Sequence, residues 1–214
     1  MSSTNYFDLA YRNYESQNPP AKLDHYLDII DDRLSSKTPE LLDVGCGRGA
    51  FLERASHRHP KWRLSGIDTE ADGVTATKQR VPEATVITAT ATELPFTSGT
   101  LDVVTAWDVL EHIPDLDSAV AEIERCLRPG GLFCLVVPVY DGVTGPLVRL
   151  LDRDPTHVHK RSRDFWIDLI ASRFDSLLWH GIHRYLLVGS IYLHRPTRRL
   201  RSASAAILIS AVRR

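Results

Sequence analysis

The residues with the clearest chemical potential are three glycines and the segment that leads into them. Gly45, Gly47 and Gly49 stand at alternate positions directly after an apolar run over residues 41–44, and a helical pattern follows them. This order predicts a strand, a tight turn and a helix N-terminus, where glycine lets the backbone approach a ligand and the first helical amides can donate to it. The stretch therefore predicts a nucleotide-binding corner.

The glycine spacing and the acid Asp43 narrow the type of nucleotide. A dinucleotide fold uses G-x-G-x-x-G to seat a pyrophosphate on the helix N-terminus. Here the pattern is G-x-G-x-G, and Asp43 comes two residues before the first glycine. Because a carboxylate repels a pyrophosphate and attracts an ammonium group, the corner favours a ligand that carries a positive charge.

A second acid, Asp68, ends the next predicted strand. It lies about 20 residues beyond the glycines, the separation at which an acid binds a ribose in a nucleotide fold. A carboxylate there can accept from both ribose hydroxyls. The alternative is that Asp68 caps the helix that follows.

The glycine corner is the first of several stretches that resemble, in order, the motifs of class I S-adenosylmethionine-dependent methyltransferases. The resemblance covers roughly residues 40–180, and its specificity lies in the ordered series. It implies the cofactor S-adenosylmethionine and transfer of its methyl group to an oxygen, nitrogen or carbon nucleophile. The matching stretches are 41–49 (LLDVGCGRG), 65–69 (SGIDT), 90–96 (TATELPF), 101–104 (LDVV), 109–115 (VLEHIPD) and 127–131 (LRPGG).

The resemblance also implies which residues contact the cofactor. This chain departs from the family at Thr90, where an acid usually accepts from the adenine amino group. A hydroxyl can still accept that bond, and the amide of Ala91 can serve a ring nitrogen. The implied cofactor contacts are Asp43, Gly45, Cys46, Gly47, Gly49, Asp68, Thr69, Thr90, Ala91 and Asp108.

One acid and two histidines are the candidates for catalysis. Asp108 follows a predicted strand, so it can hold the cofactor's ammonium group or the acceptor, cap the next turn, or act as a base. His157 is the leading general base and His159 the second, because imidazole titrates near neutral pH. The alternative for His157 is to pin its loop to Asp154 or to a backbone carbonyl. His112 is expected to be packed and hydrogen-bonded rather than a base.

Disulfide and metal chemistry have little support in the sequence. The cysteines, Cys46, Cys126 and Cys134, have neither the even number of a disulfide framework nor metal-ligand spacing. A constellation of acids that could hold a metal is not evident either. The sequence therefore predicts no metal site and metal-independent transfer.

An alternation of strands and helices must position these residues. From residue 41 onward the signals alternate, which predicts parallel strands joined by helical crossovers. The expected fold is α/β: a Rossmann-like, seven-stranded, mostly parallel sheet with helices on both faces and an antiparallel last strand. The predicted strands are residues 41–44, 62–68, 84–88, 101–106, 132–137, 174–180 and 205–212, and helices are predicted from the glycines to about residue 57 and over 116–127.

Three segments add to this alternation. Residues 1–39 are predicted as a helical cap, which either packs on the sheet edge or folds over the cofactor as a lid with Tyr11 or Tyr14 near the sulfonium. Residues 138–161 form a long connection within the methyltransferase domain, 40–214, and such loops commonly carry specificity. An apolar stretch at 185–193 lines the acceptor pocket or completes the core.

Composition excludes several classes of protein. The 214 residues are 25% charged and 43% apolar, as expected for one globular domain. A net charge of −1 argues against nucleic-acid binding through a bulk positive field. The charge is uneven, because no acid follows Asp175 whereas several arginines do. The sequence has no signal-peptide pattern and no apolar run long enough to span a bilayer, which predicts a cytoplasmic protein without membrane insertion. The expected partner is a small-molecule acceptor, bound by a monomer or homodimer.

Two other functions fit parts of the pattern. A nicotinamide-dependent oxidoreductase would use a related sheet, but Ala50 and Leu52 stand where a third fingerprint glycine would be, and Asp43 disfavours a pyrophosphate. A non-catalytic binding protein with the same fold is supported only by Thr90 in place of an acid.

Overall fold

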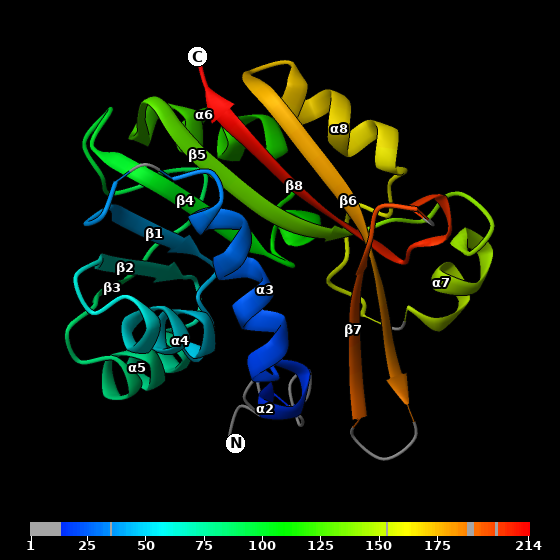
Figure 1. Cartoon of the computed structure of the whole chain (residues 1–214), viewed down its shortest axis with the longest axis horizontal. Helices are drawn as coiled ribbons and strands as arrows, with labels where there is room; N and C mark the ends of the chain where they lie inside the picture. The colour runs from blue at the N-terminus through cyan, green and yellow to red at the C-terminus, as the bar shows by residue number, and fades with distance from the viewer. Residues whose placement is uncertain (1–13, 35, 153, 188–190, 200) are drawn as a thin grey trace.

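The computed structural model describes residues 14–34, 36–152, 154–187, 191–199 and 201–214, and a twisted sheet runs through its centre (Figure 1). Among the described residues the sheet has eight strands in the order β3-β2-β1-β4-β5-β8-β6-β7. The strands are β1 (Glu40–Val44), β2 (Arg63–Asp68), β3 (Thr85–Thr88), β4 (Leu101–Trp107), β5 (Leu127–Pro138), β6 (Phe174–Leu187), β7 (Ile191–Thr197) and β8 (Ala206–Arg213). The helices are α2 (Tyr14–Gln17), α3 (Pro20–Asp31), α4 (Ala50–Arg58), α5 (Ala71–Arg80), α6 (Leu116–Cys126), α7 (Gly145–Leu151) and α8 (Arg163–Ala171), with short 3-10 turns η1 (Leu110–His112) and η2 (Arg201–Ala203).

The strand directions confirm the predicted fold class and correct the strand count. Strands β3, β2, β1, β4 and β5 pair in parallel, and β8 pairs antiparallel with both β5 and β6. The predicted seventh strand is therefore β8, and it is antiparallel as expected. The extra strand is β7, which pairs antiparallel with the second half of β6. The apolar stretch at 185–193, predicted as one segment of core or pocket wall, falls on the end of β6 and the start of β7, and its residues 188–190 lie outside the described residues.

Each central strand sends alternate residues to two separate hydrophobic cores. Val103 packs into the core under α3, α4 and α5, whereas its neighbour Val104 packs into the core under α6 and α8. Both residues are fully buried, as expected for parallel strands covered on both faces. The helices consequently lie on both sides of the sheet in Figure 1.

Local signals fix where the two helices on one face begin. The side chain of Asp115 accepts a hydrogen bond from the Ser118 amide at the start of α6, and Ser162 does the same for the Phe165 amide at the start of α8. These caps satisfy amides that have no partner within the helix. The apolar residues of α6 then recur at helical spacing on its buried side.

The long connection at 138–161 contains a helix that the sequence pattern did not specify. Helix α7 carries Leu147 and Leu150, which are 53% and 76% exposed. The remainder of the connection returns toward the centre of the sheet, where it reaches the site described below. In the part of the chain that the structure describes, none of the helices has the length and apolar character needed to cross a bilayer.

Three histidines join α3 to the β6–β7 hairpin. His25 Nδ1 lies 3.0 Å from His194 Nε2, and His25 Nε2 lies 3.1 Å from His180 Nε2. Burial, with His25 adding to the effect, lowers the pKa of His180 to about 4 and that of His194 to about 3. The cluster is therefore uncharged near neutral pH and holds the helix against the hairpin.

Candidate active site

A cavity of about 800 Å³ opens where β1, β2 and β4 end. This is the edge of an open α/β sheet where ligands bind, outside the carboxyl ends of the strands. The loop after each of these strands contributes to its wall, as do α3, the connection at 138–161 and β6. The predicted site residues on the wall are Asp43, Gly45, Cys46, Gly47, Asp68, Thr69, Thr90, Ala91, Asp108 and His157.

The first glycine of the corner allows a close approach between two loops. Gly45 has a φ of +70°, and a Cβ placed there would lie 2.5 Å from Val109 Cγ2 in the loop after β4. Any larger residue at this position would therefore clash with the Val109 side chain, which lines the cavity. Gly49 meets a similar limit against Thr77 of α5, at 2.8 Å, but it lies outside the cavity wall. Gly49 therefore lets the start of α4 pack closely against α5 and does not face the cavity.

Tyr14 occupies the start of the helix that follows the glycines. Its hydroxyl oxygen accepts hydrogen bonds from the amides of Arg48 and Ala50, each at 3.2 Å. Two amides that the sequence offered as donors to a ligand are thus held by this side chain. Burial raises the pKa of Tyr14 to about 12, so the phenol stays neutral. Tyr11, the other tyrosine considered near the sulfonium, lies outside the described residues.

Asp43 and Asp68 lie at the end of the cavity beside the glycines, and their environments differ. Asp43 is 2% exposed and accepts a hydrogen bond from Thr105 Oγ1 at 2.6 Å. Burial raises its pKa to about 7, and the Asp68 carboxylate adds to the rise while Thr105 opposes it. Asp68 accepts from the amides of Gly47 and Glu70 at 2.8 and 2.9 Å, yet it still lines the cavity. Both carboxylates can therefore meet a bound cation or hydroxyl.

Thr69 and Thr90 form the exposed rim of this end. The Thr90 hydroxyl lies 3.0 Å from Thr92 Oγ1 and accepts from the Thr92 amide at 3.3 Å. Neighbouring Ala91 is buried and also lines the cavity. The departure from the family's acid thus leaves a hydroxyl at the same place on the cavity wall.

Asp108 is paired with two cations that sequence reasoning missed. Its carboxylate forms an ion pair with Arg184 from β6, and Lys22 of α3 interacts with it electrostatically. Although burial opposes the effect, Arg184 and Lys22 lower the pKa of Asp108. The residue adopts a φ of +57°, a left-handed conformation that turns the chain out of β4. A carboxylate with a lowered pKa is suited to orienting a ligand and is a weak base.

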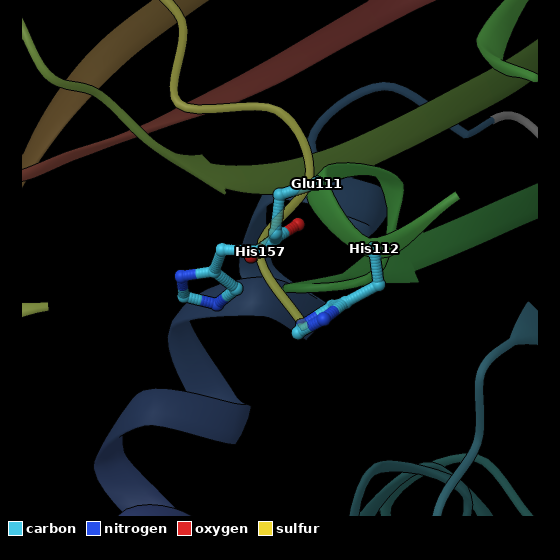
Figure 2. A group of neighbouring side chains, drawn as sticks. All are labelled: Glu111, His112 and His157. Carbon is cyan, nitrogen blue, oxygen red and sulfur yellow. The ribbon is translucent and has the colours of Figure 1, made fainter. Parts of the chain in front are cut away.

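Three side chains at the other end of the cavity converge on one another: Glu111, His112 and His157 (Figure 2). One ligand atom from each lies within 4.8 Å of those of the other two. Glu111 is fully buried, and burial, with Asp108 adding to it, raises its pKa well above the ordinary value. Burial and the neighbouring His157 lower the pKa of His112. The group therefore combines a buried carboxyl with two imidazoles, and the lowered pKa of His112 favours its neutral form.

The loop histidine His157 is held through its Nδ1 atom. This atom lies 3.0 Å from Asp152 Oδ2 and 3.1 Å from the Tyr140 hydroxyl. Its Nε2 lies 3.9 Å from Asp154 Oδ2, so the contact that holds the ring in its loop is with Asp152 more than with the Asp154 of the loop-pinning alternative. His112 is anchored in the same way, with Nδ1 at 2.8 Å from Thr156 Oγ1. In both rings the described hydrogen bonds are made by Nδ1, so Nε2 is the atom that can contact a ligand.

His159, the second candidate base, lies away from the cavity. Its Nε2 is 2.9 Å from the carbonyl oxygen of Ile113, and its ring packs edge-on against Trp166. His159 therefore holds the loop in place by packing. From the sequence alone, two histidines in one short stretch could not be told apart as base and packing residue.

Stacked aromatic rings form the apolar part of the wall. The rings of Tyr26 and Trp107 stack with their centroids 4.2 Å apart, and Phe51 meets Trp107 edge-on. All three side chains line the cavity. The signal for this wall was present in the sequence as a helical pattern within residues 1–39, but helical spacing does not show which strand the helix faces.

Comparisons with known proteins point to one family. Residues 42–135 match the family model described as a methyltransferase domain. A nocamycin O-methyltransferase from Saccharothrix syringae is 38% identical over 119 residues, which are 53% of this chain and 41% of that protein. An uncharacterized methyltransferase from Bacillus subtilis is 32% identical over 165 residues, which are 69% of this chain and 60% of that protein. The chain thus spans less than two thirds of the length of these curated relatives.

Solved structures share the fold at low sequence identity. A Thermotoga maritima protein, described as a methyltransferase and possible histamine N-methyltransferase, has a TM-score of 0.72 at 14% identity, over 98% of this chain and 96% of that chain. The match to the domain model, the relatives and the shared fold agree with the ordered motifs. Residues 42–135 thus resemble a methyltransferase domain, and the chain has the fold of solved structures described as S-adenosylmethionine-dependent methyltransferases.

Proposed function

We propose that this chain transfers the methyl group of S-adenosylmethionine to an oxygen or nitrogen nucleophile of a small molecule. The observation that carries the proposal is the extent of one cavity, which reaches from Asp43 and Asp68 to the group of Glu111, His112 and His157. A methyl donor held at the first end would face an acceptor held at the second. Holding two reactants in line at close range supplies much of the rate of such a transfer.

The donor set at the first end fits S-adenosylmethionine. The Asp68 carboxylate can accept ribose hydroxyls, the Asp43 carboxylate can attract the ammonium group, and the Thr90 hydroxyl can accept from the adenine amino group. All three side chains line the cavity. We assign the remaining contacts to Gly45, Cys46, Gly47, Thr69, Ala91 and Asp108.

The second end supplies the groups that an acceptor needs. When bound, the cofactor provides a methyl group activated by its sulfonium. The stacked Tyr26 and Trp107 suit an acceptor with an apolar body and exclude water from it. In the metal-free form of the mechanism, His157 takes the acceptor's proton at Nε2 because Asp152 holds Nδ1. Asp108, held by Arg184, orients the ammonium group or the acceptor.

The N-terminal segment fits a cap over this cavity. We propose that residues 1–39 form the cap and 40–214 the methyltransferase domain, with 138–161 as the specificity segment. In support, Lys22, Leu23 and Tyr26 of α3 line the cavity, and the connection at 138–161 contributes His157.

Names among the relatives favour oxygen as the methylated atom. The nocamycin O-methyltransferase and a ubiquinone biosynthesis O-methyltransferase from Chromobacterium violaceum, 32% identical over 113 residues, are both named for it. We therefore propose a hydroxyl-bearing small molecule as the first acceptor class to screen, with amines second, bound by a monomer or homodimer.

Calorimetric titration with S-adenosylmethionine, S-adenosylhomocysteine and NAD tests the cofactor assignment. We expect saturable binding of the two sulfur nucleotides and none of NAD. Asp68→Ala should weaken binding of S-adenosylhomocysteine by about 1 to 3 kcal/mol, because a half-buried acceptor of hydroxyl donors is lost.

Asp117→Ala, an exposed acid on α6, is the matched control and should bind as the wild type does. Binding of NAD instead of the sulfur nucleotides would overturn the proposed activity. Unchanged affinity of Asp68→Ala would remove Asp68 from the ribose site while leaving the cofactor in place.

A further inference from the structure

Glu111, His112 and His157 have the donor types and the convergence of a metal site. The first two come from η1 after β4, and the third comes from the connection at 138–161 (Figure 2). Their ligand atoms lie within 4.8 Å of one another, a span that one ion can bridge with bonds of about 2.0–2.2 Å after small side-chain movements. Two imidazoles and one carboxylate form a set that first-row transition metals favour.

Both imidazoles have the second hydrogen bond that metal-binding histidines usually have. His112 Nδ1 bonds to Thr156 Oγ1, which in turn donates to Asp154 Oδ1 at 2.5 Å. His157 Nδ1 bonds to Asp152 Oδ2, a carboxylate that also accepts from Tyr140 and Lys160. Such carboxylate-linked bonds fix the ring orientation and present Nε2 to the metal.

The carboxylate of Glu111 supplies an independent observation. It is fully buried, and among the described residues neither of its oxygens has a hydrogen-bond partner. Burying a carboxylate without a partner is costly, and most buried carboxyl oxygens are bonded. A cation beside Glu111 would satisfy both oxygens and offset this cost.

The charges around the group also suit a cation. Asp154 Oδ2 lies 3.9 Å from His157 Nε2, and Asp108 lies close enough to Glu111 to act on it electrostatically. The positive charges nearby already face other carboxylates: Arg184 and Lys22 act on Asp108, and Lys160 pairs with Asp152. Among the described residues, none of these cations is hydrogen-bonded to Glu111.

We propose that Glu111, His112 and His157 bind one divalent first-row transition-metal ion, through a Glu111 oxygen and the Nε2 atoms of both histidines. The donor set suits Zn²⁺, Mn²⁺, Fe²⁺ or Co²⁺ better than Mg²⁺ or Ca²⁺, which prefer oxygen ligands. This replaces the metal-independent transfer predicted from the sequence, where the two histidines stand 45 positions apart.

The ion would give these residues a different part in the proposed methyl transfer. All three line the cavity, so an ion held by them keeps open positions toward the acceptor. An acceptor hydroxyl on such an ion loses its proton to solvent more readily, and His157 then acts as a ligand instead of a base. This catalytic use rests on the proposed function, whereas metal binding itself does not.

Titration of chelator-treated protein with Co²⁺ tests the site directly. We expect one Co²⁺ per chain, visible absorption from the bound ion, and its displacement by Zn²⁺. Glu111→Gln and His157→Gln should each weaken Co²⁺ binding by at least about 100-fold, because even the loss of a supporting hydrogen bond costs 10- to 100-fold.

His25→Gln is the matched control, because it alters a histidine cluster outside this cavity. It should bind Co²⁺ as the wild type does. Thermal unfolding and S-adenosylhomocysteine binding check that each variant is folded, and His157→Gln, on a loop, remains informative if Glu111→Gln does not fold. Absence of Co²⁺ binding by the wild type, unchanged binding by His157→Gln, or loss of binding in His25→Gln would overturn the metal site. None of these results depends on methyl transfer.

Discussion

The raised pKa of Asp43 should make cofactor affinity depend on pH in the neutral range. Only the charged carboxylate attracts the ammonium group of S-adenosylmethionine. With a pKa of about 7, this carboxylate is ionised above pH 7 and protonated below it, so affinity should fall as the pH drops through 7.

The size of the effect follows from the ionised fraction. About one tenth of Asp43 is charged at pH 6 and about one half at pH 7, which predicts a roughly fivefold gain in affinity, or about 1 kcal/mol. The ligand's ammonium group titrates above this interval, so the ligand keeps its positive charge from pH 6 to 7.

Calorimetry of S-adenosylhomocysteine binding at pH 6.0, 6.5 and 7.0 measures the slope. Asp43→Asn should bind weakly with little pH dependence. Thr105→Val removes the hydrogen bond that lowers the pKa of Asp43, so it should move the rise in affinity to higher pH. A wild-type affinity that stays flat from pH 6 to 7, or an equal slope in Asp43→Asn, would refute the reasoning.

Two further predictions concern stability. His180 has a pKa of about 4 when folded against 6.5 for the free side chain, so its contribution is present above pH 6.5 and lost as the pH falls toward 4. Between pH 7.5 and 5.0 the wild type should therefore lose about 2 kcal/mol more unfolding free energy in urea than His180→Gln does, and equal losses would contradict this. Tyr14→Phe leaves the amides of Arg48 and Ala50 without their acceptor, so it should lower the unfolding free energy by about 1 kcal/mol, and unchanged stability would show that water replaces the hydroxyl.

The sequence was most informative where local pattern and burial coincide. Parallel strands covered on both faces appear as short apolar runs, and β1, β2, β3 and β4 begin and end within about two residues of their predicted places. The glycine corner was equally readable, because its backbone requirement is local. These signals placed Asp43, Asp68 and Asp108 at one edge of the sheet, as the cavity wall confirms.

The parts that were missed depend on contacts between distant segments. Arg184 lies 76 residues from Asp108, and nothing in the basic character of its surroundings indicates which acid it pairs with. The convergence of Glu111 and His157 likewise requires the path of the connection at 138–161. A pattern within one segment can name candidate ligands, but only the packing of loops on the sheet shows which of them meet.

The position of β8 has a consequence for how the chain assembles. It follows β6 and β7 along the chain, yet it pairs between β5 and β6, and its residues 206–211 are all buried. During synthesis the parallel half of the sheet can form as soon as β5 is available, whereas the β6–β7 hairpin must wait for the strand that joins it to the rest. Arg184, carried on that hairpin, therefore reaches Asp108 late. The nascent chain would form its glycine corner well before Arg184 completes the part of the cavity wall around Asp108.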